Sequence, residues 1–175
     1  MGSLRKPEKV KLIVGLISND IALFDKIKSL LQRKFNNPVD FESPVMDFEC
    51  TDYYGEEMGK SLKRKFLSFK KTVPLKNIEK VKLLTNAVEK KNSVNGKRRI
   101  NIDPGYLDLS KLVLFSTKDY SHRIHVGSGI FAEVTLFYRD KKFNAWPWTY
   151  PDYKTEGYIL VFNRIRDIYK SDMTN

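Results

Sequence analysis

Residues 100–123 of the chain read Ile-Asn-Ile-Asp-Pro-Gly-Tyr-Leu-Asp-Leu-Ser-Lys-Leu-Val-Leu-Phe-Ser-Thr-Lys-Asp-Tyr-Ser-His-Arg. Proline presets φ at the second position of a turn, and glycine tolerates positive φ at the third. The Asp-Pro-Gly-Tyr segment at 103–106 therefore predicts a type II turn. This turn would join a short strand at 99–103 to a strongly apolar strand at 112–115, and we expect the unit to lie at the centre of the molecule.

Polar side chains crowd around this unit. Polar groups that flank so apolar a strand need hydrogen-bond partners or a ligand. We therefore expect a functional site here, with candidate residues Asn101, Asp103, Tyr106, Thr117, Lys118, His122 and Arg123.

The composition is that of one folded domain. A chain of 175 residues, 41% hydrophobic and 13% aromatic, can bury about 70% of its extended surface. We expect a loose tail at 1–8 and a single domain at 9–172. No run approaches the roughly 18 apolar residues that cross a bilayer, so no membrane is expected as a partner. The lone Cys50 excludes an internal disulfide and fits a reducing cytoplasm.

The chain is strongly basic, with 32 Lys and Arg against 21 Asp and Glu and a net charge of +11. This excess favours an anionic partner, either a nucleic acid or a charged small molecule. The alternative is a solvated surface rich in Lys and Glu, which the spread of lysines over many segments favours.

Strands and helices alternate in the first part of the chain. An apolar, β-branched run at 10–17 predicts an interior strand, and apolar residues at helical spacing follow the capping residues at 18–20. The expected elements are strands at 10–17, 39–50, 65–73 and 97–103 and helices at 23–35, 52–63 and 78–88. This order predicts a ferredoxin-like β-α-β-β-α-β unit.

The second part of the chain is richer in strands. Further strands are expected at 111–117, 122–126, 130–138 and 143–146, followed by an aromatic, proline-stiffened loop at 147–153 and an amphipathic helix at 158–169. The predicted fold is therefore α+β. A C-terminal antiparallel meander and a closing helix extend the ferredoxin-like unit, and the helices pack mainly on one face.

Two fragments are similar to nucleotide-binding motifs but depart from them. The segment at 55–61, Gly-Glu-Glu-Met-Gly-Lys-Ser, has three residues between its first glycine and Gly-Lys-Ser, whereas a P-loop needs four. The segment at 117–119, Thr-Lys-Asp, lacks the residue that separates Lys from Asp in the guanine-reading motif. Neither fragment supports a GTPase.

Carboxylates offer an alternative function for the site. Asp52, Asp103 and Glu133 could together supply oxygen ligands for Mg²⁺ with a phosphate ligand. Scattered carboxylates more often pair with lysine or face solvent. His122 and His125 face opposite sides of a strand, so they cannot chelate one ion together.

Basic and aromatic residues also alternate at 60–71, as they do in single-stranded nucleic-acid sites. On a strand, Phe66 and Phe69 would point to opposite faces, so at most one ring would be exposed. The aromatic loop at 147–153 is a stronger signal, because proline holds its rings rigid at little entropic cost. It would form a pocket wall or a lid over the core.

Six motifs occur in order along the chain: Asp52-Tyr-Tyr…Glu57-Met-Gly59, Asn101-Ile-Asp-Pro-Gly-Tyr106, Leu112…Ser116-Thr-Lys118, His122-Arg-Ile124, Ala132-Glu-Val-Thr-Leu136 and Pro147-Trp-Thr-Tyr-Pro-Asp-Tyr153. Together they resemble a prokaryotic domain family of unknown function, whose members sometimes carry a GTP-binding label. The resemblance implies a small cytoplasmic protein. It also implies that the Asp-Pro-Gly segment, the His-Arg pair and the aromatic loop belong together.

The first functional hypothesis is a pocket for a nucleotide or another phosphorylated small molecule. Cationic side chains would neutralise the ligand, polar ones would hydrogen-bond it or seat Mg²⁺, and aromatic ones would stack on it. The candidates are Asp52, Tyr53, Tyr54, Asn101, Asp103, Tyr106, Lys118, His122, Arg123, Glu133, Trp148 and Tyr150.

Two other hypotheses stand beside it. One is an RNA-binding or protein-interaction module that uses the basic face, and the other is a purely structural partner protein. A salt-dependent affinity for RNA would favour the first of these two.

Overall fold

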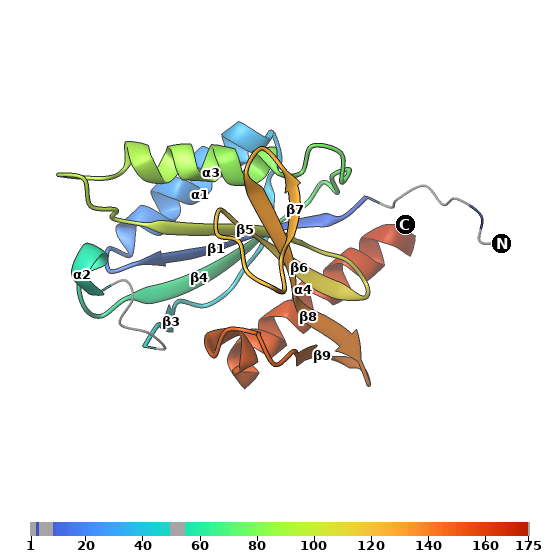
Figure 1. The fold of residues 1–175 in the computed structure, drawn as a ribbon. Helices are drawn as coiled ribbons and strands as arrows, with labels where there is room; N and C mark the ends of the chain where they lie inside the picture. The colour runs from blue at the N-terminus through green and yellow to red at the C-terminus, as the bar shows by residue number, and fades with distance from the viewer. Residues whose placement is uncertain (1–2, 4–8, 50–54, 175) are drawn as a thin grey trace.

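The computed structural model describes residue 3 and residues 9–49 and 55–174 (Figure 1). Its centre is a nine-stranded sheet in the order β2-β4-β1-β5-β6-β8-β7, with β3 beside β4 and β9 beside β8. Neighbouring strands pair antiparallel. The α+β class predicted from the sequence is confirmed.

Strands and helices are interspersed as far as α3, five consecutive strands follow it, and a 3₁₀ turn and α4 close the described part of the chain. The elements are β1 (Lys11–Ser18), α1 (Ala22–Phe35), β2 (Val39–Glu42), β3 (Met46–Asp47), α2 (Gly55–Met58), β4 (Lys63–Phe69), α3 (Lys80–Lys91), β5 (Asn101–Leu107), β6 (Lys111–Ser116), β7 (Ile124–Gly127), β8 (Ile130–Arg139), β9 (Lys142–Ala145), a 3₁₀ turn (Asp152–Lys154) and α4 (Glu156–Thr174).

Helices cover both faces of the sheet. Along β1, which is buried throughout, Leu12, Val14 and Leu16 pack against α1 and α3, and Ile13 faces the core formed with α4. Figure 1 shows α1 and α3 on one side of the sheet and α4 on the other. The expectation that the helices lie mainly on one face is therefore corrected. The other face of the sheet is also apolar, and α4 packs on it and shields it from water.

The predicted Pro-Gly turn is wrong. Strand β5 runs straight through Pro104 and Gly105 and pairs with β1 along its whole length. The chain reverses after Leu107 instead, where the Asp108 carboxylate accepts hydrogen bonds from the backbone N–H groups of Ser110 and Lys111. Glycine at position 105 allows β5 and β6 to approach closely, because a Cβ there would lie 2.2 Å from the backbone oxygen of Val113 in β6.

Strands β5 and β6 pair over three residues and then part. Ile102 directs its N–H to the Glu89 carboxylate, and its carbonyl accepts from the Lys82 ammonium, both from α3. Peptide groups alternate sides along a strand, so Pro104 faces the same way as Ile102. Because proline has no N–H to donate, the ladder with β6 ends there. The sheet is split beyond Pro104, while β6 stays paired with β8.

The segment at 55–61 does not form a phosphate-binding loop. Helix α2 occupies its first four residues, Gly59 and Ser61 have positive φ values of 82° and 58°, and β4 begins at Lys63. A P-loop joins a strand to a following helix, whereas this segment joins a helix to a following strand. The short helix expected at 52–63 is confined to Gly55–Met58 among the described residues, and the first part of that range lies outside them.

Candidate functional site

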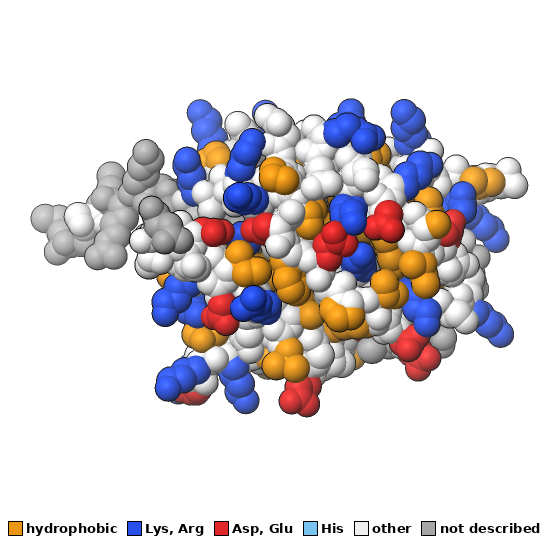
Figure 2. All heavy atoms as spheres, turned by 180° about the vertical axis from the view of Figure 1, so that it is seen from behind, with side chains coloured by type: hydrophobic (Ala, Val, Ile, Leu, Met, Phe, Trp, Pro, Cys, Tyr) orange, Lys and Arg blue, Asp and Glu red, His pale blue; other side chains and the backbone are white. Residues whose placement is uncertain are grey.

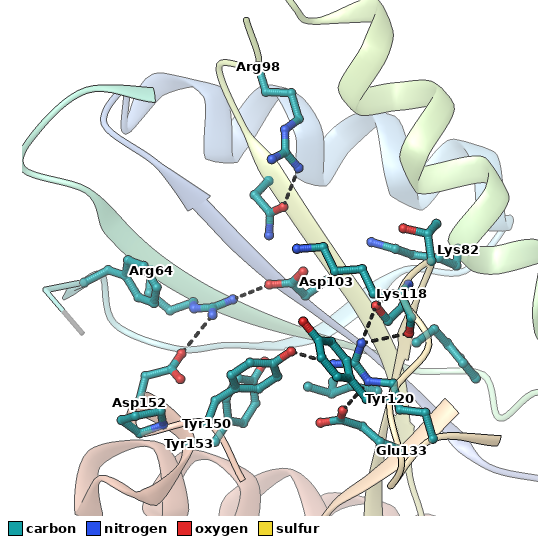
Figure 3. A pocket seen from close by; sticks show the side chains of 18 residues that line it. Arg64, Lys82, Arg98, Asp103, Lys118, Tyr120, Glu133, Tyr150, Asp152 and Tyr153 are labelled. Carbon is teal, nitrogen blue, oxygen red and sulfur yellow. Dashed lines mark hydrogen bonds and ion pairs between the residues drawn. The ribbon is translucent and has the colours of Figure 1, made fainter. Parts of the chain in front are cut away.

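A pocket of about 500 Å³ occupies the split between β5 and β6 (Figure 3). Asn101 and Asp103 of β5 line one side, and residues 114–118 line the other. Lys82 reaches the pocket from α3 on one face of the sheet, and residues 150–153 border it from the aromatic loop. Segments far apart in the sequence therefore meet where Pro104 opens the sheet.

Positive charge prevails along the pocket walls. Five cationic side chains face three carboxylates: Arg64, Lys82, Arg98, Lys118 and Arg123 against Asp103, Glu133 and Asp152. A concave surface with an excess of one sign concentrates the field and attracts ligands of the opposite sign. The pocket therefore favours an anionic ligand.

Arg64 links the two walls of the pocket. Its Nη1 donates to Asp103 at 2.9 Å and its Nη2 donates to Asp152 at 3.0 Å. Burial by itself would raise the pKa of Asp103, but the charges of Arg64 and Lys82 outweigh it and hold that pKa below its ordinary value. Asp103 is therefore an ionised carboxylate at neutral pH.

The low pKa of Asp103 predicts a pH-dependent stability. The ionised carboxylate contributes fully above its unfolded-state pKa of about 3.9, and this contribution disappears as the pH falls through the lower folded-state pKa. Asp103→Asn should cost about 2 kcal/mol at neutral pH, and this cost should shrink in urea unfolding titrations at progressively lower pH. A cost that stays constant with pH would contradict the assignment.

Arg98 and Asn101 form the end of the pocket nearest α2. Arg98 binds both carboxylate oxygens of Glu57 at 2.8 and 2.7 Å, and its Nη1 donates to Oδ1 of Asn101 at 2.9 Å. These bonds to Arg98 lower the pKa of Glu57. Because Oδ1 of Asn101 accepts from Arg98, its Nδ2 is left as a donor.

Three buried polar atoms on the pocket walls have no hydrogen-bond partner within the described residues. They are Nε of Arg64, Nδ2 of Asn101 and the hydroxyl oxygen of Tyr153, on residues that are at most 4% exposed. Burial raises the pKa of Tyr153 well above its ordinary value, so its hydroxyl stays neutral. Buried polar groups in native proteins are nearly always paired, so these three atoms are expected to bind water or a ligand.

Arg123 joins the loop after β6 to the aromatic loop. Its Nε donates to Glu133 at 2.7 Å, and its Nη1 donates to the Ser116 hydroxyl and the Lys118 carbonyl at 3.0 and 2.9 Å. Its Nη2 donates to the Tyr150 hydroxyl at 2.6 Å. With four hydrogen bonds to the protein, Arg123 positions the two loops around the pocket.

His122 lies within a stack of aromatic rings beside the pocket. Its ring stacks between Tyr120 and Trp148, with ring centroids 5.9 and 5.8 Å away, and Trp148 stacks on Trp146 at 5.1 Å. The Nε2 atom of His122 lies 3.2 Å from the Glu133 carboxylate. Of these rings, Tyr120 lines the pocket.

The structure brings together one part of the predicted site. The candidates that line the pocket are Asn101, Asp103, Thr117, Lys118, Arg123, Glu133 and Tyr150. Tyr106 packs against Phe115, and His122 and Trp148 belong to the neighbouring ring stack. Asp52, Tyr53 and Tyr54 lie outside the described residues.

Several lining residues were not singled out from the sequence: Arg64, Lys82, Arg98, Tyr120, Asp152 and Tyr153. A signal existed for Lys82, because it shares a face of α3 with Glu89 and the apolar Val88, and a buried charge on an apolar helix face needs a partner. Asp152 and Tyr153 belong to the last quoted motif. Arg64 stood within the basic and aromatic run at 60–71, which was interpreted as a possible nucleic-acid stripe.

Asp103 and Glu133, two of the three proposed metal ligands, do not share a metal seat. Asp103 is bound to Arg64 and Glu133 to Arg123, so a guanidinium occupies the oxygens that a cation would need. In the part of the chain that the structure describes, no group of three or more His, Cys, Asp or Glu side chains could hold a metal ion. Asp52, the third proposed ligand, lies outside that part.

The basic and aromatic stripe along β4 is not a stacking surface. Lys63 pairs with Asp47, and Lys65 pairs with Glu42 at 2.7 Å. Phe66 and Phe69 are both fully buried, because α4 covers one face of the sheet and α1 the other. On the face seen in Figure 2, Lys and Arg are scattered among acidic and apolar side chains.

Comparison with known proteins identifies the chain at the level of its family. Residues 8–169 match the family model of a domain of unknown function, DUF4416. The chain therefore belongs to this family. Neither a curated protein nor a solved structure matches it. No helix in the described ranges combines the length and apolar character needed to span a membrane.

Proposed function

We propose that this protein binds a nucleotide or another phosphorylated small molecule in the pocket between β5 and β6. The observation that carries the proposal is the set of three unpartnered buried polar atoms on the walls of a pocket with excess positive charge. Phosphate oxygens accept several charge-assisted hydrogen bonds at once, and Arg and Lys are their usual donors. The volume of about 500 Å³ lies in the range of small-molecule sites.

Lys118 is the side chain in the best place to close over such a ligand. It is exposed on the loop after β6, and its side chain extends across the pocket toward Asp103 (Figure 3). Lys82 lies deeper in the pocket and is buried, and Arg98 is partly exposed at the end of the pocket nearest α2. A phosphate between these groups would be held from several directions.

Thermal shift with inorganic phosphate, sugar phosphates and nucleotides tests the proposal. A ligand at a hundred times its Kd should stabilise the protein by about 2.7 kcal/mol, seen as a higher Tm. Lys118→Ala should weaken this binding about tenfold, since it removes one charge-assisted contact. The control is Lys170→Ala, at an exposed position on α4, which should bind as the wild type does. Absence of a shift with every compound would refute the proposal.

We further propose that β1, α1, β2, β4, α3 and β5 form a ferredoxin-like unit. Their strand order is β2-β4-β1-β5 with antiparallel neighbours, and each helix joins two strands that are separated by a third. Both helices pack on the same face. This arrangement is that of a split β-α-β fold. An experimental structure that superposes on ferredoxin-like domains would support it, and a different connection would refute it.

A further inference from the structure

We infer that the pocket binds its ligand in one orientation: a single phosphate lies at the Arg98 and Asn101 end, and a planar aromatic ring stacks on Tyr120 at the entrance. The ligand class is then that of a nucleoside monophosphate. This inference rests on the proposed function, because it orients the same ligand in the same pocket. It is carried by the different chemistry of the two ends.

The buried end of the pocket presents hydrogen-bond donors. Nδ2 of Asn101 forms no hydrogen bond of ordinary geometry within the described residues, although it lies near enough to Asp103 to help lower the pKa of that carboxyl, and the bond from Arg98 to Oδ1 fixes the amide in this orientation. Lys82 is 7% exposed and gives one of its three N–H groups to the carbonyl of Ile102 at 3.0 Å. Asp103 also lies here, but its carboxylate is bound to Arg64. A group rich in acceptors is therefore favoured at this end.

The donors at this end converge from separate elements. Asn101 begins β5 and Lys82 belongs to α3. Arg98 precedes β5, donates to Glu57 and Asn101, lies 3.5 Å from Glu89 and contributes its positive charge. A tetrahedral phosphate accepts hydrogen bonds from several directions, whereas a carboxylate accepts them close to one plane. The arrangement of donors therefore favours phosphate over carboxylate.

The entrance presents rigid aromatic rings. Tyr120 is 55% exposed, yet it stacks with His122 and lies 4.8 Å from the Arg123 guanidinium. Tyr150 is 45% exposed, and its hydroxyl is held by the same arginine. Exposed rings whose positions are fixed by neighbours cost little entropy on binding and suit a planar partner. A base or a similar ring is therefore expected at the entrance.

Calorimetric titration with adenosine 5′-monophosphate, guanosine 5′-monophosphate and ribose 5-phosphate tests the orientation. We expect at least one mononucleotide to bind about tenfold or more tightly than ribose 5-phosphate, which is typical of one base stacked on an aromatic ring. Tyr120→Ala should abolish this difference, because the mononucleotide should lose more affinity than ribose 5-phosphate does. Tyr120→Phe keeps the ring and should retain the difference.

Asn101→Asp tests the other end of the pocket. It keeps the size of the side chain and its bond from Arg98, but it replaces the donor with a negative charge, so all three probes should bind about tenfold or more weakly. Two outcomes would overturn the proposed ligand orientation and leave the proposed function standing. One is equal Kd values for the mononucleotides and ribose 5-phosphate, and the other is an equal loss of affinity for all probes in Tyr120→Ala. Failure of every probe and of inorganic phosphate to bind would overturn both.

Discussion

Arg64→Leu is expected to lower the free energy of unfolding by about 3–5 kcal/mol, a large share of the stability of a domain of this size. Arg64 is 2% exposed, and its guanidinium is the ion-pair partner of both Asp103 and Asp152. Its removal would leave the buried Asp152 carboxylate without this partner and would leave Asp103 only partly compensated by Lys82. The guanidinium also lies near the rings of Phe66 and Tyr153, at 5.3 and 5.6 Å, and these contacts would be lost as well.

Urea denaturation at neutral pH measures this effect, and the same strand supplies a control. Lys63→Leu removes an ion pair with Asp47 that is exposed to solvent, so it should cost less than about 1 kcal/mol. Adding Asp152→Asn to Arg64→Leu should recover part of the loss, because one unpaired charge is then removed. A loss below about 1 kcal/mol in Arg64→Leu would show that the buried ion pairs are not needed for stability.

Gly105→Ala is expected to cost about 3 kcal/mol or more, at the upper end of the range for overpacked sites. The new Cβ would lie 2.2 Å from the backbone oxygen of Val113 and 2.9 Å from Cδ2 of Leu114. The leucine side chain can rotate, but the oxygen belongs to the paired backbone of β6. The clash is relieved only if β6 moves away from β5 along the few residues that hold the two halves of the sheet together.

The matched control is Gly157→Ala in α4. A Cβ at Gly157 meets nothing within 4 Å, and alanine favours a helix over glycine, so this variant should be neutral or more stable by up to about 1 kcal/mol. Guanidinium or urea midpoints for both variants give the comparison. Equal midpoints for Gly105→Ala and wild type would mean that β6 lies farther from β5 than the structure has it.

Much of the fold follows from local patterns. The apolar run at 10–17 became β1, the helical spacing after it became α1 with Asn36 as a left-handed cap, and the last amphipathic segment became α4. These patterns are reliable because each element must bury one continuous apolar surface, which the spacing of its residues reveals. Strand ends were less accurate: the strand expected at 65–73 is β4, Lys63–Phe69.

The candidate site was predictable in part. Asn101, Asp103 and Arg123 stood out because they are polar residues beside apolar strands, and the pocket includes all three. Trp148 stood out as an aromatic loop residue, but it stacks on His122 beside the pocket instead of lining it. Composition identifies residues that need a partner, yet it does not say which partner they find.

The amino-acid sequence alone determined the α+β class, the strand and helix content and the polar character of the segment after α3. Only the tertiary structure decided what Pro104 does and which charges meet. The local preferences of a Pro-Gly pair suit a turn, and they also suit the point where a strand stops pairing with its neighbour. Which of the two forms here depends on β6, which pairs with β5 at Gly105 and separates from it at Pro104. Arg64 and Lys82 reach the pocket from β4 and α3 because the opening between β5 and β6 lets side chains from separate elements converge. Residues so far apart in the chain leave no local sequence pattern that would predict their contact.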